Sequence, residues 1–544
     1  MTEILMQNPI TKMRKYKPIT IITAFAVMTA NLQIQAGIHD DTYDEKRCDA
    51  TKVCTHPIAK GYPYIEKDGP AFSVSVNDET TALYNDTNYW GGNVTFGSFE
   101  FADGHEIAIN IRPTKTVKFF EILPHNAAFT SRPRLKDGTI EFKIKAADQK
   151  LTLVINGDYR GDVLHLFCNS IDKDVPEAVR HIRDNAVKDT RPRFVCDSTA
   201  RTVYFGSGFH RIKDKPGMAS STLTIGHDWT VYIDGGAVVE GQMNISKANG
   251  ARICGRGMLM NAEPYVTATI TDSQDSRIEG ITIHGHRAQC WNTIVGTSQR
   301  CGYRNVNLVT TRYASTDGLD INHCQDCTWD NVFIRSADDA VAIKGLADAK
   351  LKPTDCPPNK NLTFTRMQLW NDCNNAFGMG AETRASAYQN IRLADSEILF
   401  SYDDPNYHEK LDERAAMNIC ALQGTWFRDI VFENILVNRC ERLASMGFKG
   451  DFWFGTIQGD QTFPGGIDGV TFRNVSSPHT SGSSIANDIL LYGWHKDGTP
   501  DKHIEHITFD NVQIAGRRLV YPGSQYIKRG PIQSRNLVHN LIFK

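Results

Sequence analysis

The sequence lacks an excess of charge of either sign. Lysine and arginine together number 60, and aspartate and glutamate 62, which leaves the 544-residue chain near neutral. A surface that binds nucleic acid would need a basic excess, so we expect no nucleic acid among the partners. Aromatic residues make up 10% of the chain. They suit sugar rings as well as protein cores, and for most of them we favour the core interpretation.

Long apolar runs are also missing, apart from one near the N-terminus. Basic residues precede an apolar stretch from Ile19 to about Met28, which is too short to span a bilayer. Small residues ending at Ala36 then meet Gly37, which is the layout of a secretory signal peptide. We therefore expect a signal peptide at residues 1–36, no membrane insertion, and a mature chain in a secreted or periplasmic, oxidising location.

Short signatures of phosphate, zinc and calcium binding are absent as well. The sequence contains no G-x-x-x-x-G-K-S/T loop, no H-E-x-x-H pattern and no EF-hand pattern. We therefore expect neither a cofactor nor a metal ion. The oligomeric state is left open, because no feature of the sequence bears on it.

Thirteen cysteines are present, and an odd number leaves at least one of them unpaired within the chain. Cys48 and Cys54 are close in the sequence and could form a disulfide bond that staples the mature N-terminus. Cys324-Gln-Asp-Cys327 is a C-x-x-C pattern, but no second such pattern follows and no thioredoxin-like context surrounds it. A local disulfide or two core thiols are the favoured interpretations there.

Short runs of alternating apolar and polar residues fill the region from about residue 62 to residue 169. Turn residues such as Asp137-Gly138 separate these runs, which is typical of antiparallel strands in a β-sandwich. The runs cover residues 72–76, 106–111, 139–144 and 151–155. We assign residues 37–225 to an N-terminal antiparallel β-sandwich domain, which ends in a proline-punctuated linker.

A short motif of Asn or Asp followed by apolar-x-apolar recurs through the rest of the chain. It is found at residues 278–283, 305–308, 331–334, 361–364, 390–393, 429–432, 469–472, 506–509 and 536–538. The first steps from Asn305 are 26, 30 and 29 residues, and such a period without helical patterns is typical of a solenoid. We predict an all-β chain with a right-handed parallel β-helix over residues 226–544. A leucine-rich horseshoe or a propeller fits this repeat less well.

Two acidic segments in the middle coils could carry chemistry. Ser315-Thr-Asp317-Gly precedes Ser336-Ala-Asp338-Asp339, and Asp338 follows Asp317 by 21 residues, which is close to one coil. Three carboxylates would then cluster, and one of their pKa values would be pushed up. Glycoside hydrolysis needs such a pair of protonated and ionised carboxyl groups. A purely structural role for Asp at coil turns is the alternative, which two motifs one coil apart make less attractive.

These motifs resemble the polygalacturonase and dextranase clan of glycoside hydrolases, which fold as right-handed parallel β-helices. Polygalacturonases carry N-T-D-G, D-D, G-H-G and R-I-K in this order. Residues 315–318 match the first motif with Ser in place of Asn, and residues 336–339 contain the second. The resemblance covers roughly residues 229–512 and implies a secreted, inverting hydrolase of α-glycosidic bonds. It makes Asp338 the general acid, while Asp317 and Asp339 activate a water molecule.

The two later motifs differ from the family pattern. Asn374-Asn375-Ala376 stands where G-H-G is expected, so Asn375 replaces the histidine. Ala416-Met-Asn418-Ile419 stands where R-I-K is expected, and the missing Arg and Lys would bind a uronate carboxylate. Their loss argues against galacturonan. The predicted β-sandwich resembles the dextranase side of the clan, which acts on neutral α-glucan.

Several further residues are candidates for contacting a polysaccharide or oligosaccharide substrate. Glu382 resembles a glutamate of some bacterial members, and Arg384 either binds substrate or pairs with Glu382. Lys344 is expected to point outward from the strand that begins at Asp338-Asp339. There it could contact substrate or simply be solvated. A long step between repeats around residues 402–410 predicts a loop that shapes a cleft or only covers the surface. The full set of candidates is Asp320, Lys344, Asn375, Glu382, Arg384, His408, Lys410 and Asn418.

Two other functions remain open on the sequence alone. A polysaccharide lyase on the same fold would bind calcium through Asp317, Asp338 and Asp339 and would need a basic residue, for which only Lys344 is evident. A non-catalytic carbohydrate-binding solenoid is the other alternative. It would tolerate the substitution Asp338→Asn, whereas the hydrolase would lose most of its rate.

Overall fold

The computed structural model is almost entirely β-structure. It describes residues 42–44, 53–65, 69–184, 190–261, 266–286, 291–313, 315–402, 414–452, 457–478, 488–530 and 536–544. Within these, the helical elements are α1 (Glu177–Asp184) and the short 3-10 turns η2 (Ile212–Asp214) and η3 (Pro353–Asp355). The expected signal peptide lies outside the described residues. None of the described helices has the length and apolar character needed to cross a membrane.

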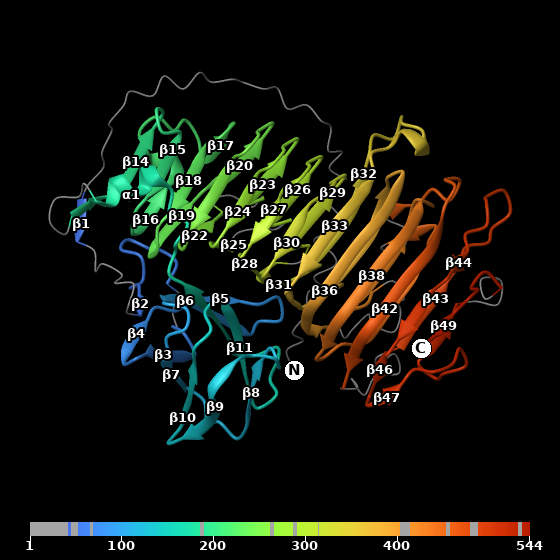
Figure 1. Cartoon of the computed structure of the whole chain (residues 1–544), viewed down its shortest axis with the longest axis horizontal. Coiled ribbons are helices and arrows are strands. Elements are labelled where there is room, and N and C mark those ends of the chain that lie inside the picture. The colour runs from blue at the N-terminus through green and yellow to red at the C-terminus, as the bar shows by residue number, and fades with distance from the viewer. Residues whose placement is uncertain are drawn as a thin grey trace, which may run out of the picture. The chain divides into compact units, whose positions relative to one another are not determined.

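Two sheets form the N-terminal β-sandwich, as expected (Figure 1). One is antiparallel, with the order β4 (Glu79–Thr81), β3 (Phe72–Val76), β7 (Ile107–Pro113), β10 (Thr139–Ile144) and β9 (Phe129–Lys136). The other has the order β2 (Cys54–Thr55), β6 (Asn93–Phe101), β12 (Val163–Ser170), β11 (Gln149–Ile155) and β8 (Phe120–Leu123), with β5 (Tyr84–Thr87) also on β6. The pairing of β6 with β12 is parallel, which the alternating runs did not predict.

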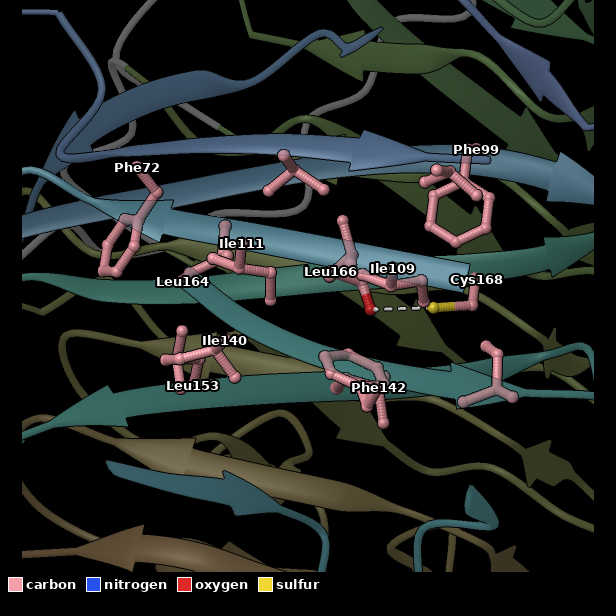
Figure 2. Packing of buried hydrophobic residues seen from close by; sticks show 14 of the residues in the cluster. Phe72, Phe99, Ile109, Ile111, Ile140, Phe142, Leu153, Leu164, Leu166 and Cys168 are labelled. Atoms are coloured by element: carbon pink, nitrogen blue, oxygen red, sulfur yellow. Dashed lines mark hydrogen bonds between the residues drawn. The ribbon is translucent and has the colours of Figure 1, made fainter. Parts of the chain in front are cut away.

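The core of the sandwich lies between its two sheets. Ile109 and Ile111 of β7 face Leu164 and Leu166 of β12, and all four are at most 2% exposed. Figure 2 shows these side chains, together with Phe142 of β10, filling the space between the ribbons. Successive residues of a strand point to opposite faces, so the period of two in the sequence corresponds to this one-sided burial.

The rest of the chain is a right-handed parallel β-helix, in which each strand pairs with the equivalent strand of the next coil (Figure 1). One of its sheets has eleven strands and will be called the site sheet. Its neighbours pair in parallel throughout, in the order β17 (Thr222–Ile225), β20 (Gln242–Ser246), β23 (Ala268–Thr271), β26 (Thr293–Gly296), β29 (Leu319–Asn322), β32 (Val341–Leu346), β35 (Phe377–Arg384), β37 (Met417–Ala421), β39 (Arg442–Phe448), β43 (Asp488–Tyr492) and β48 (Ile527–Arg529).

The remaining faces of the coils belong to one 23-stranded sheet. Its strands are β14 (Phe194–Asp197), β15 (Thr202–Phe205), β16 (Gly208–Arg211), β18 (Thr230–Ile233), β19 (Ala237–Glu240), β21 (Arg252–Gly255), β22 (Met258–Met260), β24 (Arg277–Glu279), β25 (Thr282–His284), β27 (Gly302–Arg304), β28 (Asn307–Thr310), β30 (Thr328–Asp330), β31 (Phe333–Ser336), β33 (Asn359–Thr365), β34 (Gln368–Asn371), β36 (Ala387–Ser401), β38 (Trp426–Val437), β42 (Gly466–Ser477), β44 (Ile504–Glu505), β45 (Thr508–Asp510), β46 (Gln513–Ile514), β47 (Arg517–Arg518) and β49 (Ile542–Phe543). Strand β15 pairs in parallel with β18, so coil strands occur before residue 226. Two small pairs complete the set, β1 (Thr42–Asp44) with β13 (Thr190–Pro192) and β40 (Asp451–Phe452) with β41 (Ile457–Gln458).

The recurring Asn or Asp of the repeat has a conformational cause. Asn305, Asn331, Asn361 and Asn390 all have φ between 53° and 54°, in the left-handed region that Asn and Asp tolerate better than other side chains. Asn331, for example, lies between β30 and β31, where the chain bends from one strand into the next. The side chains also bond from coil to coil, because Nδ2 of Asn390 donates to Oδ1 of Asn361 at 2.9 Å.

The helix interior repeats in the same register. Trp329 pairs with Phe364 one coil further on, and their rings stack 4.5 Å apart at an interplanar angle of 7°. Cys324 and Cys327 are free, buried thiols of this core, so the C-x-x-C pattern holds no disulfide. Cys48 lies outside the described residues, and its bond to Cys54 stays a prediction.

The bend between coil strands can be tested at Asn361. Replacing it with Val places a β-branched residue at a φ of 54° and removes the hydrogen bonds to Asn390 and to Asp326, whose Oδ1 lies 2.7 Å from Nδ2 of Asn361. We expect Asn361→Val to lower the free energy of unfolding by about 2 kcal/mol. Asn361→Gly is the matched control, because it loses the same hydrogen bonds without backbone strain. Equal melting temperatures for the two variants would contradict this explanation.

Candidate active site

The predicted acidic residues lie at the start of consecutive strands of the site sheet. Leu319 of β29 pairs with Val341 of β32, and Val341 pairs with Phe377 of β35. Counting back two residues from each, Asp317, Asp339 and Asn375 occupy equivalent positions on three consecutive coils. The backbone continues this alignment, because the Gly318 amide donates to the Asp339 carbonyl at 2.8 Å.

Two asparagines of the next coil hold the aspartate pair. Nδ2 of Asn374 donates to Oδ1 of Asp338 at 2.7 Å. Oδ1 of Asp339 accepts from both the backbone amide and Nδ2 of Asn375, each at 2.8 Å. Asn375 was predicted from its place in the family pattern, whereas Asn374 was missed. The register would have identified it, because Asn374 aligns with Asp338 as Asn375 aligns with Asp339.

Lys344 contacts the aspartate cluster on the side away from the two asparagines. It is therefore not solvated, which was one of the two alternatives expected from the sequence. It is 7% exposed, and its Nζ lies 3.0 Å from Oδ2 of Asp317 and 3.2 Å from Oδ1 of Asp320. The same Nζ sits 4.1 Å from the ring centroid of Trp291, a cation–π contact that a desolvated ammonium group favours. Lys344 therefore neutralises only part of a buried group of four carboxyls.

Burial shifts the protonation of this group. It raises the pKa of Asp317 to about 6, an increase that Lys344 opposes and Asp338 reinforces. Burial also raises the pKa of Asp339 well above its usual value, and the charges of Asp317 and Asp338 add to this effect. For Lys344, burial lowers the pKa, but Asp317 and Asp320 outweigh it, so the pKa is raised and the ammonium form persists. The cluster therefore holds at least one carboxyl proton in the weakly acidic range.

Exposure distinguishes the members of the cluster. Asp338 is 9% exposed and Asp320 only 1%, with Asp317 and Asp339 between them. All three predicted catalytic aspartates thus lie together, mostly buried but in contact with solvent. Asp320, predicted to contact substrate, lies beneath Lys344 in the same cluster.

The structure places the other predicted substrate residues on the next strands of the same sheet. Arg384 of β35 is partly buried and pairs with Asp460 at 3.8 Å, so its ion-pair partner is not Glu382. Glu382 is half-buried and contributes to the raised pKa of Lys344. Asn418 of β37 is 2% exposed, and its Oδ1 has no hydrogen-bond partner among the described residues. His408 and Lys410 lie outside the described residues.

The sequence and the structure were compared with protein families, curated proteins and solved structures. No family model and no curated protein matches the sequence. Among solved structures, Dex49A from Penicillium minioluteum aligns with a TM-score of 0.51 at 11% identity, over 92% of this chain and 100% of that chain. A family 28 exopolygalacturonase from Yersinia enterocolitica aligns with a TM-score of 0.44 at 11% identity, over 84% and 98% of the two chains. The likeness to Dex49A confirms the expected fold.

The raised pKa of Asp317 gives a stability prediction. The folded state holds this proton more tightly than the unfolded state, so its stabilising contribution is complete below about pH 4 and lost as pH rises through about 6. Asn at this position cannot ionise. We expect the stability of Asp317→Asn relative to wild type to rise by on the order of 2 kcal/mol between about pH 4 and pH 7, measured as melting temperature.

Asp330→Asn is the matched control. Burial raises the pKa of Asp330, but hydrogen bonds from Arg366 and Thr365 and the charges of Arg366 and Arg304 together outweigh it and lower the pKa, so Asp330 is already ionised above about pH 4. Its stability difference from wild type should stay constant over the upper part of that range. A flat profile for Asp317→Asn as well would show that the cluster holds no extra proton.

Proposed function

We propose that this chain is a secreted glycoside hydrolase that cleaves α-glycosidic bonds of a neutral polysaccharide by acid/base catalysis with inversion. The observation that carries the proposal is the alignment of Asp317 and Asp339 on consecutive coils, with Asp338 beside them and Lys344 balancing only part of their charge. Burying like charges is costly, and glycoside hydrolysis is a chemistry that uses the resulting pair of protonated and ionised carboxyls.

The family resemblance and the exposures together suggest the roles. Asp338, the most exposed of the three, donates a proton to the glycosidic oxygen as the bond from that oxygen to the anomeric carbon breaks. Asp317 and Asp339 hold a water molecule, and Asp317, whose pKa of about 6 leaves it ionised at neutral pH, takes a proton from it as the water oxygen attacks the anomeric carbon from the opposite face. Asn374 and Asn375 fix the two neighbouring carboxyls by the hydrogen bonds described above.

The charges of the site sheet favour a neutral substrate. Strands β29, β32, β35, β37 and β39 carry three basic residues, and a carboxylate engages each of them. Lys344 contacts Asp317, Arg384 contacts Asp460, and Nε of Arg442 lies 2.9 Å from Oδ1 of Asp488. A uronate is normally bound by a cation that is free to form charge-assisted hydrogen bonds with it. These strands offer no such cation, which agrees with the missing R-I-K motif.

The three aspartates should be individually necessary for the reaction. Changing Asp317, Asp338 or Asp339 to Asn keeps the shape of the side chain but removes its proton transfer, so we expect kcat to fall about 10²–10⁴-fold with little change in KM. Asp348→Asn is the control, because Asp348 is exposed just after β32 and should leave kcat unchanged. An Asp338→Asn variant with wild-type kcat would rule out the assigned role.

Substrate and stereochemistry can be measured in one experiment. We expect the purified chain to release oligosaccharides from a neutral α-glucan such as dextran and not from polygalacturonate. Proton NMR during the first turnovers should show the β-anomer at the new reducing end, because a single displacement inverts the α-bond. An unsaturated product absorbing in the ultraviolet, lost on chelation, would favour the lyase. Binding without any cleavage would favour the non-catalytic solenoid.

A further inference from the structure

Three side chains that are not part of the aspartate cluster meet where the β-sandwich packs on the β-helix. Asp86 comes from β5 of the sandwich, His284 ends β25 of the helix, and His286 follows it by two residues. Oδ2 of Asp86 lies 3.3 Å from Nε2 of His284 and 3.6 Å from Nδ1 of His286. The three ligand atoms all lie within 4.8 Å of one another, and each of the three residues is buried.

The ring protons of the two histidines do not provide a hydrogen bond for every buried polar atom of this group. Nδ1 of His284 is 3.0 Å from the Val309 carbonyl and must carry the proton, because a carbonyl can only accept. A single ring proton on Nδ1 leaves Nε2 of His284 with its lone pair toward Oδ2 of Asp86, 3.3 Å away. Oδ2 of Asp86 and Nδ1 of His286 are both buried, and neither has a hydrogen-bond partner within the described part of the chain. Asp86 itself is fully buried.

We propose that Asp86, His284 and His286 bind a divalent transition-metal ion of the zinc type. Two imidazole nitrogens and one carboxylate oxygen are a common ligand set for such ions, with bonds of about 2.0–2.2 Å. Ligands at that distance in a tetrahedron are separated by roughly 3.3–3.6 Å. The two separations from Oδ2 of Asp86, 3.3 and 3.6 Å, match this edge length.

A proton fits the same place less well than a metal ion. If His286 carried it on Nδ1, the 3.6 Å distance to Oδ2 of Asp86 would be too long for a normal hydrogen bond. Nε2 of His284 would still face the carboxylate with a lone pair. A metal ion accepts electron pairs from all three atoms at once, and the bond from His284 to the Val309 carbonyl has the form that orients metal-binding histidines.

Arg312 orients Asp86 and influences how tightly the site would bind a cation. Its Nε donates to Oδ1 of Asp86 at 2.6 Å, which fixes the carboxylate and leaves Oδ2 directed at the histidines. The nearby guanidinium charge repels a cation, so we expect micromolar rather than tighter affinity. Because Asp86 belongs to the sandwich and both histidines to the helix, the ion would act as a cross-link between them and take no part in the hydrolysis.

The test uses the untagged protein without the expected signal peptide, and Zn²⁺ is the probe. At equilibrium dialysis against free Zn²⁺ at about tenfold the expected dissociation constant, we expect close to one zinc per chain above the dialysate by elemental analysis. The melting temperature should rise by about 3 °C in the presence of Zn²⁺, since an ion that binds only the folded state stabilises it. With Co²⁺ in its place, we expect the visible absorption of a four- or five-coordinate site.

A matched pair of variants locates the ion. His286→Gln should abolish both the stoichiometric zinc and the thermal shift, while hydrolysis of the polysaccharide persists. His539→Ala should keep both effects. It removes part of a second, more exposed group, in which Nδ1 of His503 lies 3.2 Å from Nε2 of His539.

Two results would overturn the proposal. Wild-type protein without stoichiometric zinc and without a thermal shift would show that the cluster holds a proton instead. The same zinc content in His286→Gln, or its loss in His539→Ala, would place the ion elsewhere. The wild-type measurement decides on its own if His286→Gln fails to fold.

Discussion

Parallel register between coils is the constraint on which the site depends. Equivalent residues of paired strands lie about 4.8 Å apart, so whatever the chain places at one coil it must accommodate at the next. Asp317 and Asp339 are such equivalent residues, and burial prevents water from screening their repulsion. Lys344, which reaches back one coil to Asp317, offsets only part of this charge. Raised carboxyl pKa values follow directly from this geometry.

A stiff scaffold is what allows so unfavourable a cluster to persist. The stacked Trp329 and Phe364 rings and the asparagine bends fix the coils from inside and outside. The asparagines of the following coil then hold Asp338 and Asp339 in place. The rigid solenoid thus keeps the proton donor and acceptors in a defined arrangement although their repulsion is destabilising. Active sites commonly contain such destabilising groups.

Local patterns in the sequence predict the coils and the aspartate group well. An Asn with positive φ and an alternating apolar strand are both local features, and a spacing near one coil length brings Asp317 above the Asp338–Asp339 pair. Contacts set by side-chain reach could not be predicted. Arg384 pairs with Asp460, 76 positions further on, and not with its neighbour Glu382. The contact of Asp86 with two histidines of the β-helix likewise depends on how the sandwich packs.

We infer that three acidic side chains on adjacent coils surround a single scissile bond. A crystal structure of the Asp338→Asn variant with an oligosaccharide that the wild type cleaves tests it most directly. We expect the glycosidic oxygen to lie within hydrogen-bonding distance of residue 338, and a water molecule to be held by Asp317 and Asp339 on the opposite face of the sugar. A sugar chain bound along another part of the β-helix, with the aspartates untouched, would contradict it.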